Sequence, residues 1–170
     1  MSGVSAHDVA REIRHRIGDV NTITLVQKLL YYAQGFHLAV TASPLFHERI
    51  EAFANGPVVR SVWESTNRTT ETPQPTALDY FQLELLDLVV ERYGHFSGKD
   101  LVERTHNEQP WQDAWSLGQN TELSHETMRH FFRSVLDLDR RDAEAVLLSQ
   151  EMGSLLDAPT PSDELARRLM

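Results

Sequence analysis

Apolar residues recur at the three- and four-residue spacing of an α-helix along most of this chain, and this periodicity constrains the fold more than any other feature. Capping residues and glycines mark where the periodic segments begin and end. Ser5 with Asp8, for example, opens a segment that Gly18 closes. The pattern predicts helices over residues 6–17, 24–39, 76–94 and 97–105, another after Ser124, and one over 139–152.

One stretch between the second and third of these long helices has a different character. It contains two short apolar runs, Leu45–Phe46 and Ile50–Phe53, followed by the turn sequence Asn55-Gly56-Pro57. We expect the two runs to form a small antiparallel hairpin near 44–54, and a short helix to begin at Val58. The predicted fold class is therefore mainly α, a single compact multi-helix domain with one small β-hairpin.

The helix predicted over 24–39 has two features that the structure can test. Thr24 and Gln27 form a possible capping box at its start. Gly35 lies in its interior, where a glycine costs about 1 kcal/mol relative to alanine. Either close contact with another helix or a break in this helix would explain that glycine.

The length of 170 residues fits one domain with a C-terminal tail. We expect a domain over 1–136, and a helical extension with a flexible tail over 137–170. The absence of cysteine excludes disulfides, thiolate metal sites and a cysteine nucleophile. No apolar run approaches 18 residues and the N-terminus lacks a signal-peptide segment, so we expect a cytoplasmic protein without membrane contact.

Acidic residues outnumber basic ones by 25 to 16, which gives a formal net charge of −9. Binding to a phosphate backbone requires neutralising lysines and arginines, so nucleic acid is not an expected partner. The helices predicted over 6–17 and 24–39 have the lengths of a helix-turn-helix. However, the second presents apolar side chains such as Leu29 and Phe36 where base-reading residues would be needed. DNA binding is therefore the less favoured alternative.

The sequence contains no strong signal for catalysis. His125 and His130 are five residues apart, which turns the second imidazole about 140° beyond the first on a helix, so the pair does not match a zinc-protease motif. His106 could be a general base, but a hydrogen-bonded histidine at a helix end is the simpler interpretation. Phosphate-binding and nucleophile-elbow motifs are absent. We expect no enzyme activity, no cofactor and no metal.

Three segments of the sequence resemble a known family. They are QKLLYYAQGFHLA (27–39), PLFHERIEAFANGPVV (44–59) and LDLVVERYGHFSGKDLVERTHNEQPW (86–111). Their motifs K-L-L-Y-Y-x-x-G, E-A-(aromatic)…G-P-V and T-H-x-E-x-P-W occur in the order and spacing of the Panacea domain, also called the SocA-like or phage-associated GepA-like domain. The family more often has tryptophan where Phe53 stands and an aromatic residue where Asn55 stands.

The resemblance implies an antitoxin that neutralises a cognate toxin protein, encoded by an adjacent gene, through direct protein contact. An alternative implied by one family member is an adaptor that delivers the toxin to an ATP-dependent protease. Many members occur in prophages. No catalytic or cofactor-binding residue follows from the resemblance.

Two sets of residues carry these expectations. The motif positions are expected to define the fold; they are Lys28, Leu29, Tyr31, Tyr32, Gly56, Pro57, Val58, His106, Pro110 and Trp111. The candidate toxin contacts are aromatic or arginine side chains of the kind that anchor interfaces; they are Phe46, Phe53, Trp63, Phe131, Phe132 and Arg133. For each of them, ordinary packing in the core is the favoured alternative.

Overall fold

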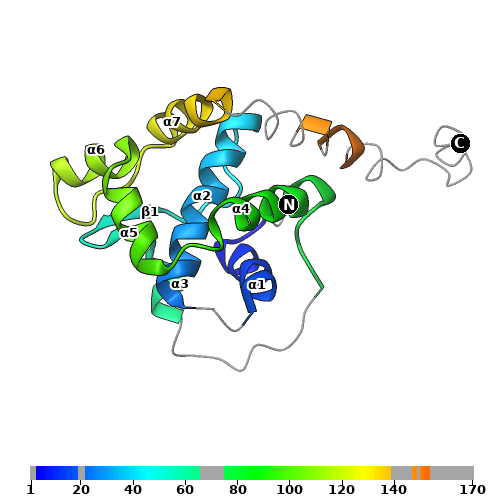
Figure 1. Cartoon of the computed structure of the whole chain (residues 1–170), viewed down its shortest axis with the longest axis horizontal. Helices are drawn as coiled ribbons and strands as arrows, with labels where there is room; N and C mark the ends of the chain where they lie inside the picture. Colours follow the sequence, from blue (N-terminus) through cyan, green and yellow to red (C-terminus); the bar gives the residue numbers. More distant parts are fainter. Residues whose placement is uncertain (1–2, 19–21, 66–74, 139–146, 149, 154–170) are drawn as a thin grey trace, which may run out of the picture.

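Helix α2 (Ile23–Thr41) runs through the middle of the computed structural model, and the other elements lie around it (Figure 1). The structure describes residues 3–18, 22–65, 75–138, 147–148 and 150–153. Every residue of α2 from Leu25 to Leu38 is buried, so this helix has no solvent-exposed face over that length. A helix that is covered on all sides is the central element of a core, not a surface element.

The remaining elements follow in chain order around α2. They are α1 (Ala6–Ile17), β1 (Ile50–Phe53), β2 (Gly56–Val59), α3 (Arg60–Ser65), α4 (Tyr80–Tyr93), α5 (Gly98–His106), α6 (Gln109–Leu117) and α7 (His125–Leu138). The fold is therefore mainly α with one small antiparallel sheet, as the sequence predicts.

Several helix boundaries follow the predicted capping chemistry. The side chain of Ser5 caps α1 in a full capping box with Asp8, and Ser97 caps α5 with Asp100 in the same way. The predicted N-cap of α2 is wrong by two residues. The hydroxyl of Thr22, not that of Thr24, accepts the hydrogen bond from a first-turn amide. Thr22 takes this role because its backbone is extended, as an N-cap requires, whereas Thr24 already lies inside the helix.

The hairpin is present, but its strands differ from the prediction. β1 matches the expected run, whereas its partner is β2 and not the segment Leu45–Phe46. The turn is therefore Ala54–Asn55, and Gly56 and Pro57 belong to the second strand. Proline is accepted there because the residue opposite it, Ala52, directs its N–H and carbonyl to Thr121 and Asn120, so the missing amide of Pro57 removes no hydrogen bond between the strands.

Helix α6 was not predicted from the sequence. Proline occupies the first turn of α6, where a helix has no use for its amide. At the other end of the chain, residues 147–148 and 150–153 are helical, within the range predicted for an extension. The rest of that range, 139–146, 149 and the tail 154–170, lies outside the described residues.

The glycine inside α2 is explained by contact with α7. A Cβ atom on Gly35 would lie 2.1 Å from ring atoms of Phe132, which is itself fully buried. The ring also contacts Tyr31, Tyr32 and Phe36, with centroids 5.4, 5.9 and 5.4 Å away. Of the two explanations that the sequence leaves open, close helix contact is the correct one.

This contact determines whether replacing Gly35 stabilises or destabilises the protein. Gly35→Ala would gain about 1 kcal/mol from helix propensity alone. We expect it instead to destabilise the protein by about 2 kcal/mol, since overpacking a rigid buried ring costs more than that gain. Urea denaturation measures the change. Phe132→Leu in the same chain should recover part of the loss, and stabilisation by Gly35→Ala alone would contradict the packing.

Candidate functional site

Side chains from three separate parts of the chain bind the main chain of the hairpin. The indole Nε1 of Trp111 donates to the carbonyl of Phe53, over 2.9 Å. The ring Nε2 of His106 lies 2.9 Å from the carbonyl of Ala54, so this nitrogen carries the proton. The Nζ of Lys28 donates to the carbonyl of Pro57 over 3.1 Å.

A fourth side chain completes the set. The amide of Gln27 donates to the carbonyl of Val59 over 3.2 Å and accepts from its N–H over 2.7 Å. We call Gln27, Lys28, His106 and Trp111 together the hairpin lock. They come from α2, from the end of α5 and from the start of α6, so the lock ties the hairpin to three helices.

Lys28 is the most constrained member of the lock. Its side chain is buried, and burial lowers the pKa of its ammonium group to about 8. Gly56 leaves the room for it: a Cβ there would lie 2.8 Å from Cε of Lys28 and 2.7 Å from Oγ1 of Thr105. Gly56 also has a φ of 105°, which side-chain-bearing residues rarely adopt.

The outer edge of β1 is also occupied. The N–H of Ala52 donates to the carbonyl of Thr121, and the N–H of Asn120 donates back to the carbonyl of Ala52, each over 2.8 Å. The N–H of Leu123 donates to the carbonyl of Ile50 over 2.8 Å. Gln27 therefore binds the edge of β2, and residues 120–123 bind the edge of β1. Because both edges are bonded, a partner would contact the hairpin through side chains and not by strand addition.

A buried carboxyl group lies behind the lock. The hydroxyl of Tyr32 is 3.2 Å from both carboxyl oxygens of Glu108, and its ring stacks on Tyr93 with centroids 3.8 Å apart. Burial raises the pKa of Glu108 to about 7. Sequence reasoning did not assign a role to Glu108, although it is the glutamate of the T-H-x-E-x-P-W motif. Gln27, which opens the first motif segment, was assigned to a helix cap, whereas its side chain binds Val59.

All ten motif residues have structural positions. Nine of them are buried, and His106 is half-buried. Four lie in α2, three in β2, one at the end of α5 and two at the start of α6. The side chains of Lys28, Tyr32, His106 and Trp111 form hydrogen bonds to other parts of the chain.

The six candidate toxin contacts separate into buried and accessible residues. Phe46 and Phe132 have no exposed surface, so the expectation that they contact a toxin is wrong for the folded domain. Packing in the core, the interpretation that the sequence favours for both, is the correct one. Phe53 and Phe131 are half-buried, Trp63 is 48% exposed and Arg133 is exposed.

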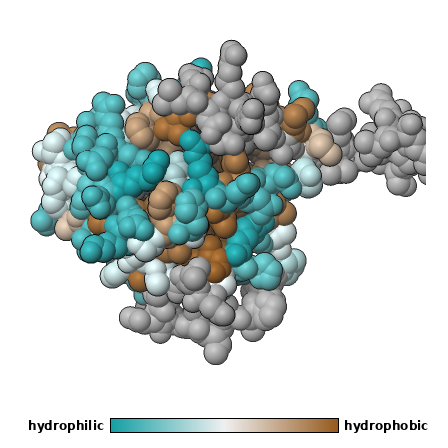
Figure 2. Space-filling view, in the orientation of Figure 1, coloured by the Kyte–Doolittle hydropathy of each residue, from teal (hydrophilic) through white to brown (hydrophobic). Residues whose placement is uncertain are grey.

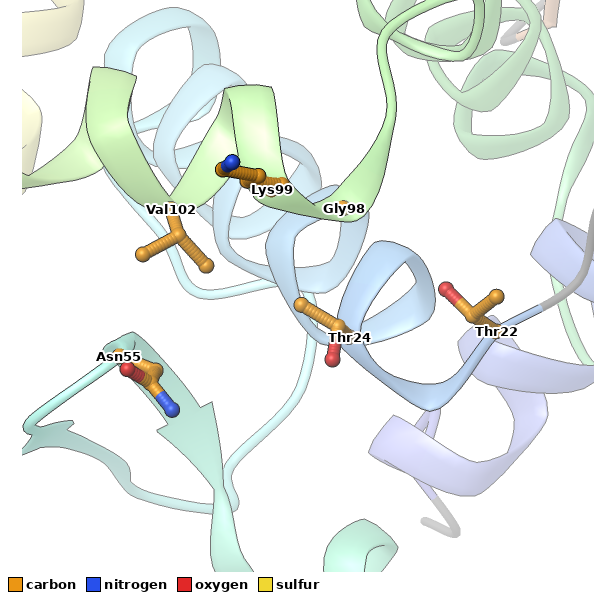
Figure 3. A pocket seen from close by; sticks show the side chains of 6 residues that line it. All are labelled: Thr22, Thr24, Asn55, Gly98, Lys99 and Val102. Carbon is orange, nitrogen blue, oxygen red and sulfur yellow. The ribbon is translucent and has the colours of Figure 1, made fainter.

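A hollow of about 460 Å³ adjoins the turn of the hairpin. Its lining residues are Thr22, Thr24, Asn55, Gly98, Lys99 and Val102. Figure 3 shows Asn55 at the hairpin end, across the open space from Thr24 and Val102. The hollow is shallow and carries one exposed lysine, without the convergent polar groups of a small-molecule site.

The described residues contain no cluster of three or more side chains suited to a metal ion. None of the helices in that part of the chain is long and apolar enough to cross a membrane. Hydrophilic residues predominate on the part of the surface that α5 and α6 form, at the left of Figure 2.

Residues 26–112 match the family model described as the antitoxin SocA-like, Panacea domain. The match covers just over half of the chain and contains the hairpin and every residue of the lock. The chain therefore belongs to this family. Neither the curated proteins nor the solved structures include a significant match.

The lock predicts a large effect of Gly56→Ala. The added methyl group would meet Lys28 and Thr105 and would also strain the backbone, so we expect a loss of about 3 kcal/mol. Gly18→Ala is the matched control, because Gly18 also has a positive φ, of 58°, but nothing lies within 4 Å of its Cβ position. Urea denaturation should give a smaller loss for the control, from backbone strain alone. Equal losses for the two variants would contradict the contact.

The buried Glu108 predicts a pH dependence of stability. The pKa of its carboxyl is 4.5 in an unfolded chain and about 7 in the folded protein, so between these two pH values the folded state binds a proton that the unfolded state releases. Stability contributed by this group therefore falls as pH rises, by about 2 kcal/mol from pH 5 to pH 7.5. Glu108→Gln should remove that part of the dependence in urea denaturation, while still accepting from Tyr32. An unchanged pH profile in the variant would rule out the shift.

Proposed function

We propose that this protein is an antitoxin that neutralises a toxin protein by direct binding, with the outer face of the hairpin as part of the docking surface. Membership of the SocA-like antitoxin family supports an antitoxin role. The observation that carries the proposal further is the hairpin lock. Four side chains from three different helices fix the main chain of one short hairpin.

A hairpin fixed in this way favours a role in binding over a role in catalysis. The groups that could act on a substrate, Lys28 and His106, are bonded to carbonyl oxygens of the chain itself. A surface that is held in one conformation before binding loses less entropy when its partner arrives. The lock therefore supports a role in recognition, in which the hairpin presents side chains in fixed positions.

The outer face of the hairpin carries residues suited to an interface. Arg60 pairs with Glu51 over 3.0 Å, and its guanidinium lies 5.1 Å from the ring centroid of Phe53. Trp63 follows in α3, with about half of its surface exposed. Arginine and aromatic side chains are the most frequent anchors of protein interfaces. The net charge of −9 would speed capture of a basic toxin.

The first experiment is co-expression with each of the two flanking genes. One flanking product should arrest growth alone, growth should return when this protein is present, and the two proteins should co-purify. A stoichiometric antitoxin leaves the toxin level unchanged. A shortened toxin half-life that depends on a protease would instead favour the adaptor mechanism, and absence of toxicity from both genes would remove the support for neutralisation.

The docking surface has its own prediction. Phe53→Ala with Trp63→Ala should weaken the complex at least tenfold in a calorimetric titration, because both remove apolar contact area from the proposed interface. Leu117→Ala is the control, since Leu117 is 81% exposed but lies at the end of α6. Full affinity in the double variant, with an unchanged melting temperature, would place the docking surface elsewhere.

A further inference from the structure

Two arginines on α7 differ from the other arginines that the structure describes. Those others form ion pairs, lie over aromatic rings or have another interaction; they are Arg11, Arg14, Arg16, Arg49, Arg60, Arg92 and Arg104. Arg129 and Arg133 make no ion pair, hydrogen bond or ring contact with any described residue. Both are exposed.

The two arginines lie on the same side of α7, four residues apart, so their guanidinium groups are neighbours. With His130 and Glu126 they line a hollow of about 220 Å³ on the helix surface. We call Arg129, His130 and Arg133 the α7 basic stripe. It is the accessible side of a helix whose buried side includes Phe132, so the core contact with Gly35 holds the stripe facing outward.

The surrounding charge makes this stripe unusual. The chain has 25 acidic residues against 16 basic ones, so carboxylates are plentiful partners for an arginine. The stripe nevertheless has one acidic neighbour in its hollow, Glu126, which forms no ion pair with it. Each of two neighbouring arginines can bind a carboxylate through two parallel hydrogen bonds.

We propose that the α7 basic stripe binds an acidic segment of the toxin, through Asp or Glu side chains that pair with Arg129 and Arg133. This inference rests on the proposed function. A protein carboxylate is favoured over a nucleic-acid phosphate because the net charge of −9 repels a polyanion more strongly than it repels a toxin that is basic overall and presents one or two carboxylates to this hollow.

The position of the stripe suggests what it contributes. The family match ends at residue 112, and α7 begins at His125. The hairpin and its lock belong to the part shared with the family, whereas the stripe lies beyond it. A contact outside the shared part can select an individual partner, because an unmatched charge on a wrong partner costs binding energy.

The test uses the full chain and the flanking gene product that it neutralises. Arg129→Glu with Arg133→Glu should weaken the complex about thirtyfold or more, and Arg129→Lys with Arg133→Lys should have an intermediate effect, because lysine keeps the charge but loses the two-pronged geometry. The control is Arg11→Glu with Arg14→Glu, which changes the net charge equally on α1, on the other side of α2 (Figure 1). Melting temperatures are measured for every variant.

A selection then identifies the partner chemistry. The selection starts from the protein that carries both Arg129→Glu and Arg133→Glu, and it seeks toxin variants that this protein neutralises again. In those toxin variants, an Asp or Glu should be replaced by Lys or Arg. Wild-type affinity in the double variant, or an equal loss in the α1 control, would overturn the inference while leaving neutralisation intact. Loss of binding to a mixed-sequence DNA duplex, with toxin binding unchanged, would assign the stripe to nucleic acid. Failure of the wild-type chain to bind any flanking product is a failure of the proposed function.

Discussion

The burial of α2 on all sides from Leu25 to Leu38 is the constraint on which the rest of the structure depends. This helix carries polar side chains into the core, and a buried polar group without a partner costs several kcal/mol. Gln27 and Lys28 therefore bind β2, and Gln34 binds the backbone at Leu45 and Phe46. The segment after α2 must return along the helix to supply those groups, which places the hairpin where it is.

The same constraint connects the fold to its function. The buried side chains that form hydrogen bonds with the main chain of the hairpin also restrict the movement of the hairpin. The lock thus gives a short two-stranded sheet, which would be only marginally stable by itself, a single conformation. A protein that acts by contact needs such a fixed surface and no reactive group.

Helix α7 shows how adjacent residues divide between stability and recognition. Phe132 fills the space that Gly35 leaves, while Arg133 faces solvent on a different side of the helix. The segment that follows the family match therefore contributes side chains to the core and also to the exposed surface. This arrangement allows the contacts of the exposed side to change while the buried side keeps the helix in place.

The sequence by itself determined the elements that depend on local interactions. The bounds of α1, the capping box of α5 and the helical fold class follow from periodicity and from residues three apart. The motifs also identified most of the site, including Lys28, His106 and Trp111. Only the tertiary structure decided that β2 is the partner of β1, that Phe46 and Phe132 are buried, and that Glu108 lies against Tyr32. These features depend on contacts between residues far apart in the chain, whose energies no local pattern contains.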